Sequence, residues 1–134
     1  MIKEIKVKTD KRQQIIDITN QVKKIVKESK VKEGIVSVYV QHTTAALIIN
    51  ENHDPNICKD IINAFDKLVQ EDGWLHNKID NNAAAHIKAA IMGPSQTIPI
   101  QDNELQLGRW QSIQIVDFDG PRERIIKVSI LPSE

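Results

Sequence analysis

Apolar and polar residues alternate at period two in the middle of the chain, which is typical of strands with one buried face. The stretch IVSVYVQH, residues 35–42, places three valines on one face and ends that row with His42. Residues 45–51 repeat the pattern and end their row with Glu51. We therefore predict two strands that each carry a polar side chain at the end of an apolar row.

Strand patterns also occur toward both ends of the chain. Alternation at residues 5–7 and an apolar stretch at 15–18 flank a polar turn, which predicts an N-terminal β-hairpin. The region that follows Gly93 contains four further strand-like stretches, SQTIPIQ, ELQL, WQSIQIVDF and ERIIKVSIL, and these predict a β-meander. Pro99 lies inside the first of them, and we expect that strand at a sheet edge because proline cannot donate a ladder hydrogen bond.

Three stretches have the spacing of amphipathic helices. TNQVKKIVKES starts at Thr19, a candidate N-cap. ICKDIINAFDKLV follows Asn56, a second candidate cap, and we expect its apolar stripe in the core. AAAHIKAAIM follows the candidate cap Asn82, and the polar residues 70–82 before it are expected to form an ordered surface loop.

Length and composition turn these patterns into a fold class. The chain has 134 residues, of which 40% are hydrophobic, and this is enough for one domain with a real core. We predict a single α+β domain over residues 1–134, with a meandering mixed or antiparallel, sandwich-like β-sheet and about three helices.

Charge and targeting features narrow the function classes. Eighteen basic and eighteen acidic residues cancel, so charge alone does not favour a nucleic-acid or membrane partner. The first ten residues lack the apolar stretch of a signal peptide, and no apolar run approaches the roughly 20 residues of a membrane-spanning helix. We expect a soluble, cytoplasmic protein, and the single Cys58 is compatible with that compartment.

The histidines are the clearest candidates for metal chemistry. His42, His76 and His86 fall at a strand end, in a loop and on a helix, and neutral imidazole is the commonest metal ligand. Their spacing matches no compact zinc motif, so structural roles for each histidine stay open. We predict that the three converge on one divalent ion, zinc or magnesium, with Glu51 or Asp54 orienting an imidazole.

Phosphate chemistry has candidates of a different kind. The hydroxyl-bearing turns at Thr43-Thr44 and at Ser95, and the arginines Arg109 and Arg122 beside turns, suit phosphate oxygens, although turn residues of these types are also common without any ligand. Neither standard glycine-rich phosphate loop occurs, and no GxSxG motif supports nucleophilic catalysis.

Taken together, the strings HTTAALIINEN with DP, DNNAAAHIKAAIMGPS, LQLGRWQSI and DFDGPR resemble the YjbQ-type family of secondary thiamine-phosphate synthases. The match runs from about residue 34 to residue 131, with four motifs in the same order. The resemblance implies a small α+β domain that assembles as a homotrimer. Arg109 stands where the family usually has threonine, and Leu75 where it usually has arginine, which affects the groups available for phosphate.

The resemblance also implies residue roles. The catalytic candidates are His42, Glu51, His86 and Arg122. The candidates for substrate or phosphate binding are Thr43, Thr44, Asn82, Ser95, Arg109, Trp110, Gln111 and Asp119. The metal candidates are His42, His76 and His86.

The implied activity is that of a transferase in thiamine biosynthesis, which joins an aminopyrimidine-methyl diphosphate to a thiazole phosphate and releases diphosphate, as a main or a secondary activity. Two alternatives stay open. One is metal-dependent hydrolysis of a small phosphorylated metabolite, with the histidines activating water. The other is a binding module that holds an anionic metabolite and catalyses nothing. In each case the partner is a small phosphorylated molecule.

Overall fold

The structure, a computed structural model, describes residues 1–134 and contains eight strands, three α-helices and one 3-10 helix. The elements in chain order are β1 (Ile2–Lys8), β2 (Gln14–Asp17), α1 (Thr19–Ser29), β3 (Gly34–Val40), β4 (Ala45–Asn50), α2 (Pro55–Leu68), η1 (Leu75–Lys78), α3 (Ala83–Met92), β5 (Ser95–Gln101), β6 (Glu104–Leu105), β7 (Ser112–Asp117) and β8 (Glu123–Pro132).

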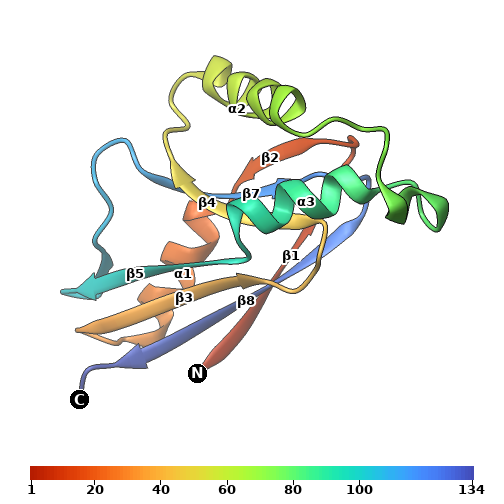
Figure 1. Cartoon of the computed structure of the whole chain (residues 1–134). Coiled ribbons are helices and arrows are strands. Elements are labelled where there is room, and N and C mark those ends of the chain that lie inside the picture. The colour runs from red at the N-terminus through yellow and green to blue at the C-terminus, as the bar shows by residue number, and fades with distance from the viewer.

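The strands form two antiparallel sheets (Figure 1). The larger sheet has the order β1-β8-β3-β5-β6, and the smaller has the order β2-β7-β4. Every strand pair is antiparallel. The predicted α+β class, with antiparallel sandwich-like sheets and three helices, is confirmed.

The main core is a cluster of 17 buried residues that draws on both sheets and on α1. The period-two pattern of β3 explains its share, because Val36, Val38 and Val40 all point inward and are fully buried. Helix α1 contributes Val22 and Val26 from one face, as expected from its spacing. This core fixes the position of β3 and so of the chain that follows it.

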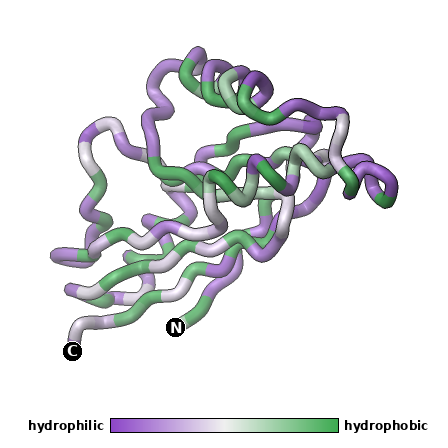
Figure 2. The backbone as a smooth tube through the Cα atoms, viewed as in Figure 1, coloured by the Kyte–Doolittle hydropathy of each residue, from purple (hydrophilic) through white to green (hydrophobic).

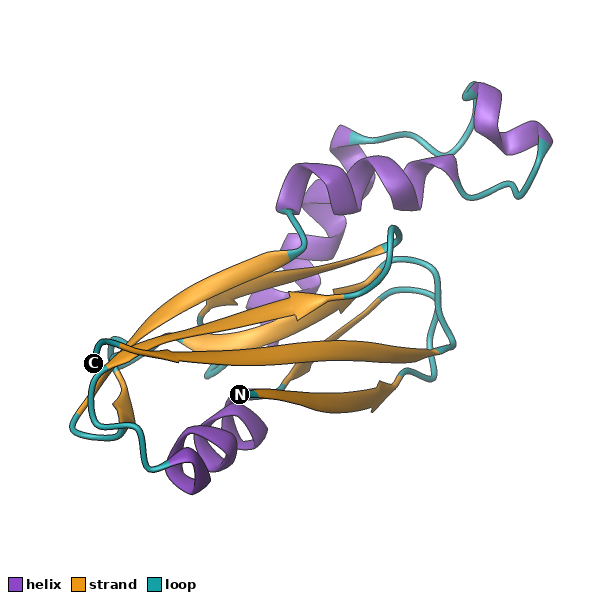
Figure 3. Cartoon of the chain, turned by 90° about the horizontal axis from the view of Figure 1, so that it is seen from below, coloured by secondary structure: helices purple, strands orange, loops and turns teal.

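A second, smaller core lies on the other side of the smaller sheet. Ala46, Val116 and Phe118 pack there against Ala85 and Ala89 of α3. Small alanine side chains let the helix approach the sheet closely. Figure 3 shows α1 and α3 on opposite sides of the strands. Because both faces of β7 are covered, all six of its residues are buried.

Two of the predicted strand pairings are wrong. The N-terminal strands do not form a hairpin, because β1 pairs with β8 and β2 pairs with β7 in the other sheet. The strands after Gly93 do not form one continuous meander either, since β7 joins the smaller sheet. Periodicity shows which face of a strand is buried, and it does not identify the neighbouring strand. The strand that holds Pro99, β5, is not at the sheet edge as expected, because the two-residue β6 pairs with its outer side.

The prediction that the stripe of α2 lies in the core is also wrong. No residue of α2 is fully buried, and Leu68 is 68% exposed. Ile61 and Phe65 instead line an open, mostly apolar groove of about 340 Å³ together with Ile48 and Met92. Figure 2 shows the hydrophobic positions of α2 along a helix at the rim of the molecule. Its pattern predicts a helix correctly and its burial incorrectly.

The helix starts differ in detail from the expected caps. Helix α2 begins at Pro55, and the N-cap is Asp54, whose side chain accepts a hydrogen bond from the Asn56 N–H. Thr19 is the first residue of α1 rather than its cap, and Asn82 is at the cap position of α3 without a capping hydrogen bond. The expected loop 70–82 contains η1. No helix combines the length and apolar character needed to cross a bilayer.

Candidate functional site

A polar cavity of about 390 Å³ opens where three turns meet beyond the Asp117 end of β7. The β3–β4 turn, the segment between η1 and α3, and the β7–β8 turn each supply part of its wall. None of its eight lining residues is hydrophobic, and they are His42, Thr43, Thr44, Asp80, Asn82, His86, Asp119 and Arg122. We call this cavity the polar pocket.

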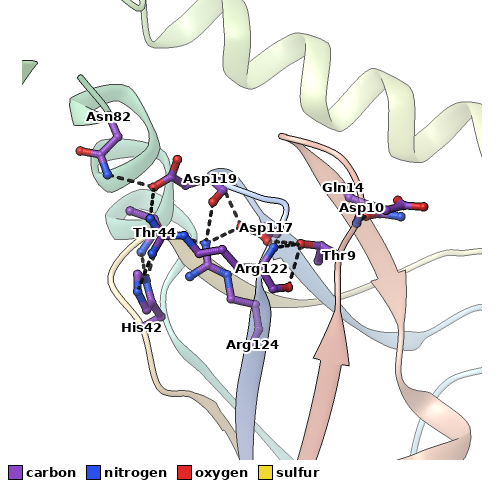
Figure 4. A network of polar contacts seen from close by, with 10 residues as sticks. All are labelled: Thr9, Asp10, Gln14, His42, Thr44, Asn82, Asp117, Asp119, Arg122 and Arg124. Carbon is purple, nitrogen blue, oxygen red and sulfur yellow. Dashed lines mark hydrogen bonds and ion pairs between the residues drawn. The ribbon is translucent and has the colours of Figure 1, made fainter. Parts of the chain in front are cut away.

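A buried ion pair lies directly behind the polar pocket (Figure 4). The guanidinium of Arg124 donates from Nη2 to Asp117 Oδ1 at 2.6 Å, and the two side chains are 1% and 0% exposed. The same Nη2 donates to Thr44 Oγ1 at 2.9 Å. Thr9 Oγ1 donates to Asp117 Oδ2 at 2.7 Å. The pair therefore ties β7 and β8 to the turn that carries His42.

The β7–β8 turn requires a glycine because the Lys11 carbonyl oxygen and two side chains lie close to its backbone. A side chain at Gly120 would place its Cβ 2.7 Å from Thr9 Oγ1 and 2.9 Å from Asp117 Oδ2, which leaves no room for one. The Asp119 N–H donates to Asp117 Oδ1 at 2.9 Å, and the Arg122 N–H donates to Thr9 Oγ1 at 3.0 Å. These bonds fix the directions in which Asp119 and Arg122 leave the turn.

His42 is held by the residue two positions after it. The Thr44 N–H donates to His42 Nδ1 at 3.2 Å, and Thr44 Oγ1 lies 3.0 Å from the same nitrogen. The other ring nitrogen, Nε2, lies 3.3 Å from Arg122 Nη1. Partial burial lowers the pKa of His42, and the positive charges of Arg124 and Arg122 lower it further. His42 is therefore neutral at neutral pH.

Hydrogen-bond acceptors of Asp119 and Asn82 line the polar pocket opposite His42 and its neighbours. Asp119 Oδ2 accepts hydrogen bonds from Asn82 Nδ2 at 2.9 Å and from Arg122 Nη2 at 3.4 Å. Asn82 Oδ1 is buried and has no hydrogen-bond partner. Half of the Arg122 side chain is exposed, so the guanidinium is open to a ligand. The pocket can accordingly donate to an anion on one side and accept from a donor on the other.

The three histidines do not form the predicted coordination sphere. His86 lines the polar pocket together with His42, whereas His76 does not line it. The rings of His76 and His86 pack edge to face, with their centroids 4.8 Å apart. His76 Nε2 lies 3.9 Å from Asp80 Oδ2. No group of three or more histidine, cysteine or carboxylate side chains is placed to hold a metal ion. Binding of a divalent ion stays a prediction.

Five of the other predicted site residues lie elsewhere. Trp110 is near the Ser112 end of β7, with the Arg109 guanidinium 4.9 Å from its ring and the His53 ring 5.0 Å from it. Gln111 Oε1 accepts a hydrogen bond from the Gly108 N–H nearby. Glu51 follows β4 at this end too, whereas Ser95 begins β5 outside the pocket.

The two ends of β7 are well separated. The strand has six residues, so its ends are roughly 17 Å apart. Trp110, Gln111 and Arg109 line a separate cavity of about 250 Å³ with Asp17, Asn52, His53 and Ser112, which we call the tryptophan cluster. One chain therefore keeps the polar pocket and the tryptophan cluster apart.

The sequence analysis did not identify three residues at or behind the polar pocket. For two of them, the hydropathy pattern of the strand indicates a buried charge. Arg124 lies in the same inward row of β8 as Ile126, Val128 and Ile130. Asp117 ends the fully buried strand β7. A charged residue in an apolar row needs a buried partner, so the pair was detectable in principle. Asp80 follows η1 in a polar loop and has no comparable signal.

Comparison with known proteins reveals similarity over nearly the whole chain. A protein-family profile described as UPF0047 protein YjbQ-like matches residues 3–133. The chain is 44% identical over 131 residues to the UPF0047 protein MJ1081 of Methanocaldococcus jannaschii, covering 98% of this chain and 94% of that protein. It is 37% identical over 131 residues to the UPF0047 protein YugU of Bacillus subtilis, covering 98% and 99%.

Two solved structures are similar in fold as well. A YbjQ-like protein of unknown function from Sulfolobus solfataricus superposes with a TM-score of 0.96 at 38% identity, covering 99% of this chain and 97% of that one. A conserved protein of the yjbq/upf0047 family from Clostridium acetobutylicum superposes with a TM-score of 0.92 at 46% identity, covering 96% and 98%.

Proposed function

Because this chain belongs to the UPF0047 family of YjbQ-like proteins, we propose that its polar pocket binds the phosphate or diphosphate group of a small metabolite. The observation that carries this proposal is the placement of Arg122 and His42, whose side-chain nitrogens lie 3.3 Å apart at a cavity without hydrophobic lining. A guanidinium beside a second polar nitrogen suits the oxygens of a phosphate.

The reaction we propose is thiamine-phosphate synthesis, following the motif resemblance. The nitrogen of the thiazole ring forms a bond to the methylene carbon of the aminopyrimidine, and the bond from that carbon to diphosphate oxygen breaks. Diphosphate leaves with the electron pair, so groups that stabilise its negative charge lower the barrier. We assign this role to Arg122, which lines the polar pocket, and Mg²⁺ would enter as part of the diphosphate substrate.

The expected rate is low. Arg122 is the only arginine that lines the polar pocket, and Leu75, which replaces an arginine of the family pattern, is 83% exposed and contributes no charge. Arg109 lies in the tryptophan cluster of the same chain. Stabilisation of the leaving diphosphate is therefore incomplete within one chain.

Product formation from the two substrates tests the reaction directly. The assay contains both substrates with Mg²⁺, Mn²⁺ or Zn²⁺, and we expect slow formation of thiamine phosphate. Arg122→Lys keeps the charge but loses the bidentate fork, so the rate should fall by roughly tenfold or more. Arg12→Lys is the matched control, since Arg12 pairs with the exposed Glu71 outside the pocket.

Three results of this assay have distinct meanings. No product with an intact fold refutes the synthase reaction, and retained phosphate binding would then support a binding module. Release of phosphate from one substrate alone would indicate hydrolysis. An equal loss in Arg122→Lys and Arg12→Lys would refute the assignment of Arg122 to phosphate.

We propose that the chain acts as a homotrimer in which the polar pocket of one copy meets the tryptophan cluster of the next. Two features support this arrangement. The motif residues are split between the two ends of β7, and the apolar face of α2 is left partly uncovered. A small domain also gains core from partner surface.

Mixed assemblies test the shared site. His42→Ala and Trp110→Ala chains are each expected to be inactive alone. Co-expression of both should restore part of the activity, because at some subunit interfaces the intact polar pocket of a Trp110→Ala chain meets the intact tryptophan cluster of a His42→Ala chain. Light scattering should give the mass of three chains. A monomer mass, or no recovery in the mixed assemblies, would refute the shared site.

A further inference from the structure

The imidazole of His42 is fixed through its Nδ1 atom. The Thr44 N–H points at Nδ1 from 3.2 Å. Thr44 Oγ1 accepts a hydrogen bond from Arg124 Nη2 at 2.9 Å, so the hydroxyl proton of Thr44 is free to point at Nδ1, which is 3.0 Å away. Nδ1 therefore accepts from Thr44 and carries no proton itself.

This arrangement determines the tautomer of the neutral ring. A neutral imidazole has one N–H, and with Nδ1 as acceptor that proton is on Nε2. The Nε2–H then faces Arg122 Nη1, 3.3 Å away. Both groups are donors, so this contact is not a hydrogen bond. Two donors stand side by side at the polar pocket with no acceptor between them.

We infer that Thr44 and Arg124 are positioning residues, which hold His42 as its Nε2–H tautomer so that His42 and Arg122 donate together to the oxygens of one anionic ligand group. That this group is a phosphate rests on the proposed function, whereas the tautomer does not. A ring with a proton on Nε2 cannot take a proton or bind a metal through that atom. His42 is then a neutral donor, in contrast to the metal ligand expected from the sequence.

The buried Arg124 orients the Thr44 hydroxyl, because its Nη2 donates to Thr44 Oγ1. Arg124 is 1% exposed, and its Nε and Nη1 atoms have no hydrogen-bond partner. Its charge is met by the single carboxylate of Asp117, and its Nη2 also polarises the Thr44 hydroxyl toward His42. The charged and titratable groups that face His42 are Arg122, Arg124, Asp117, Asp119, Asp80 and His86.

The tautomer is measured directly by long-range ¹H–¹⁵N spectra of protein labelled with ¹⁵N-histidine, without any ligand. We expect the His42 signals of an unprotonated Nδ1 and a protonated Nε2 at neutral pH. His42→Ala identifies the signals by removing them. A protonated Nδ1, or rapid exchange between both tautomers, would overturn the inference.

Substitutions of His42 test the donor role. The amide nitrogen of glutamine reaches the region of Nε2, whereas that of asparagine reaches only the region of Nδ1. We expect His42→Gln to retain affinity for inorganic phosphate within about threefold, and His42→Asn and His42→Ala to lose roughly tenfold. Equal losses in all three variants would refute donation from the Nε2 position. Only part of His42 is buried, so these variants should keep the fold.

Substitutions of Thr44 test the positioning role. Thr44→Val has nearly the same shape but lacks the hydroxyl, and it should shift the His42 Nδ1 signal and weaken phosphate binding by roughly fivefold. Thr44→Ser keeps the hydroxyl and should rescue both. Thermal unfolding verifies that the variants are folded. A Thr44→Val protein with an unchanged Nδ1 signal would contradict the role of the hydroxyl.

The measurements separate this inference from the proposed function. Wild-type protein that shows the Nε2–H tautomer but binds no phosphate would refute the proposed function and leave the tautomer established. Protein that binds phosphate with a protonated Nδ1 would support the proposed function and refute the inference.

Discussion

The two ends of β7 hold their functional candidates in different ways. At the Asp117 end, a buried ion pair connects β7, β8 and the turn that carries His42. At the Ser112 end, Trp110 is 52% exposed, with the exposed Arg109 guanidinium over its ring and the exposed His53 ring tilted against it. The first end is built within one chain, whereas the second is a surface feature.

The polar groups behind each end account for this difference. Ser112 Oγ donates to the Asn50 carbonyl at 2.9 Å, and Gln114 Nε2 donates to the Glu51 carbonyl at 2.9 Å, so these contacts of β7 are between neutral groups. The nearby Asp17 carboxylate is held by hydrogen bonds from Thr19 and Asn52 and not by a buried ion pair. At the other end, two opposite charges are removed from water, which is tolerable only with matched geometry. The buried ion pair therefore holds the turns that carry the pocket side chains, whereas the neutral bonds from Ser112 and Gln114 to backbone carbonyls hold only β7 against the end of β4.

The largest effect that we expect is from breaking the buried ion pair. Asp117→Ala leaves the Arg124 charge buried without a carboxylate and should lower the free energy of unfolding by about 3–5 kcal/mol. Asp117→Asn keeps one oxygen acceptor for Arg124 and the Asp119 N–H, and should lose less. Urea unfolding measures both. If Asp117→Ala lost less than about 1 kcal/mol, the buried ion pair would stabilise the fold no more than the neutral contacts at the Ser112 end.

The matched substitution at the opposite end should cost less. Ser112→Ala removes two neutral hydrogen bonds, the one donated to the Asn50 carbonyl and the one accepted from Gln114 Nε2, and we expect a loss of about 1–2 kcal/mol in the same urea experiment. If Ser112→Ala proved as costly as Asp117→Ala, the two ends would be anchored equally and the distinction between charged and neutral anchors would be wrong.

The sequence predicts the polar pocket better than the tryptophan cluster for a physical reason. His42 follows a buried row of valines, and Asp119 and Arg122 belong to a turn that needs Gly120, so local patterns place them near strand ends. Long-range pairing then brings these ends together, and periodicity does not encode that pairing. The same limit explains the wrong N-terminal hairpin and the uncovered face of α2.

The split of the motif residues shows a second limit. Trp110 and Gln111 precede β7, while Asp119 and Arg122 follow it, and a motif list does not state that a strand keeps them apart. Arg124 is identifiable in the sequence because it is a charged residue in an apolar row. Its role in orienting His42 depends on Thr44, and the sequence does not show that the β3–β4 turn brings Thr44 into contact with Arg124.

A smaller effect is expected for the exposed aromatic residue. Trp110→Ala removes the cation–π contact with Arg109 and the tilted ring contact with His53 but little buried surface, so the free energy of unfolding of the single chain should fall by about 0.5 kcal/mol or less. Urea unfolding at a protein concentration that light scattering shows to be monomeric measures this. A loss above about 2 kcal/mol would mean that the tryptophan cluster is part of the folded core.

The smallest effect should depend on pH. Burial raises the pKa of Asp17 in the tryptophan cluster, but hydrogen bonds from Thr19 and Asn52 outweigh it and leave the pKa below the ordinary value of 3.8. The folded chain thus favours the charged carboxylate, whose contribution to stability is present above pH 3.8 and is lost as the pH falls through the folded pKa.

Asp17→Asn should be slightly less stable than wild type at neutral pH, and the difference should shrink at about pH 3 or below. Urea unfolding at the two pH values measures this, and a difference that grows in acid would contradict it. Because Asp17 is partly exposed, the effect is well below that of Asp117, as expected if charge has a structural role mainly where it is buried.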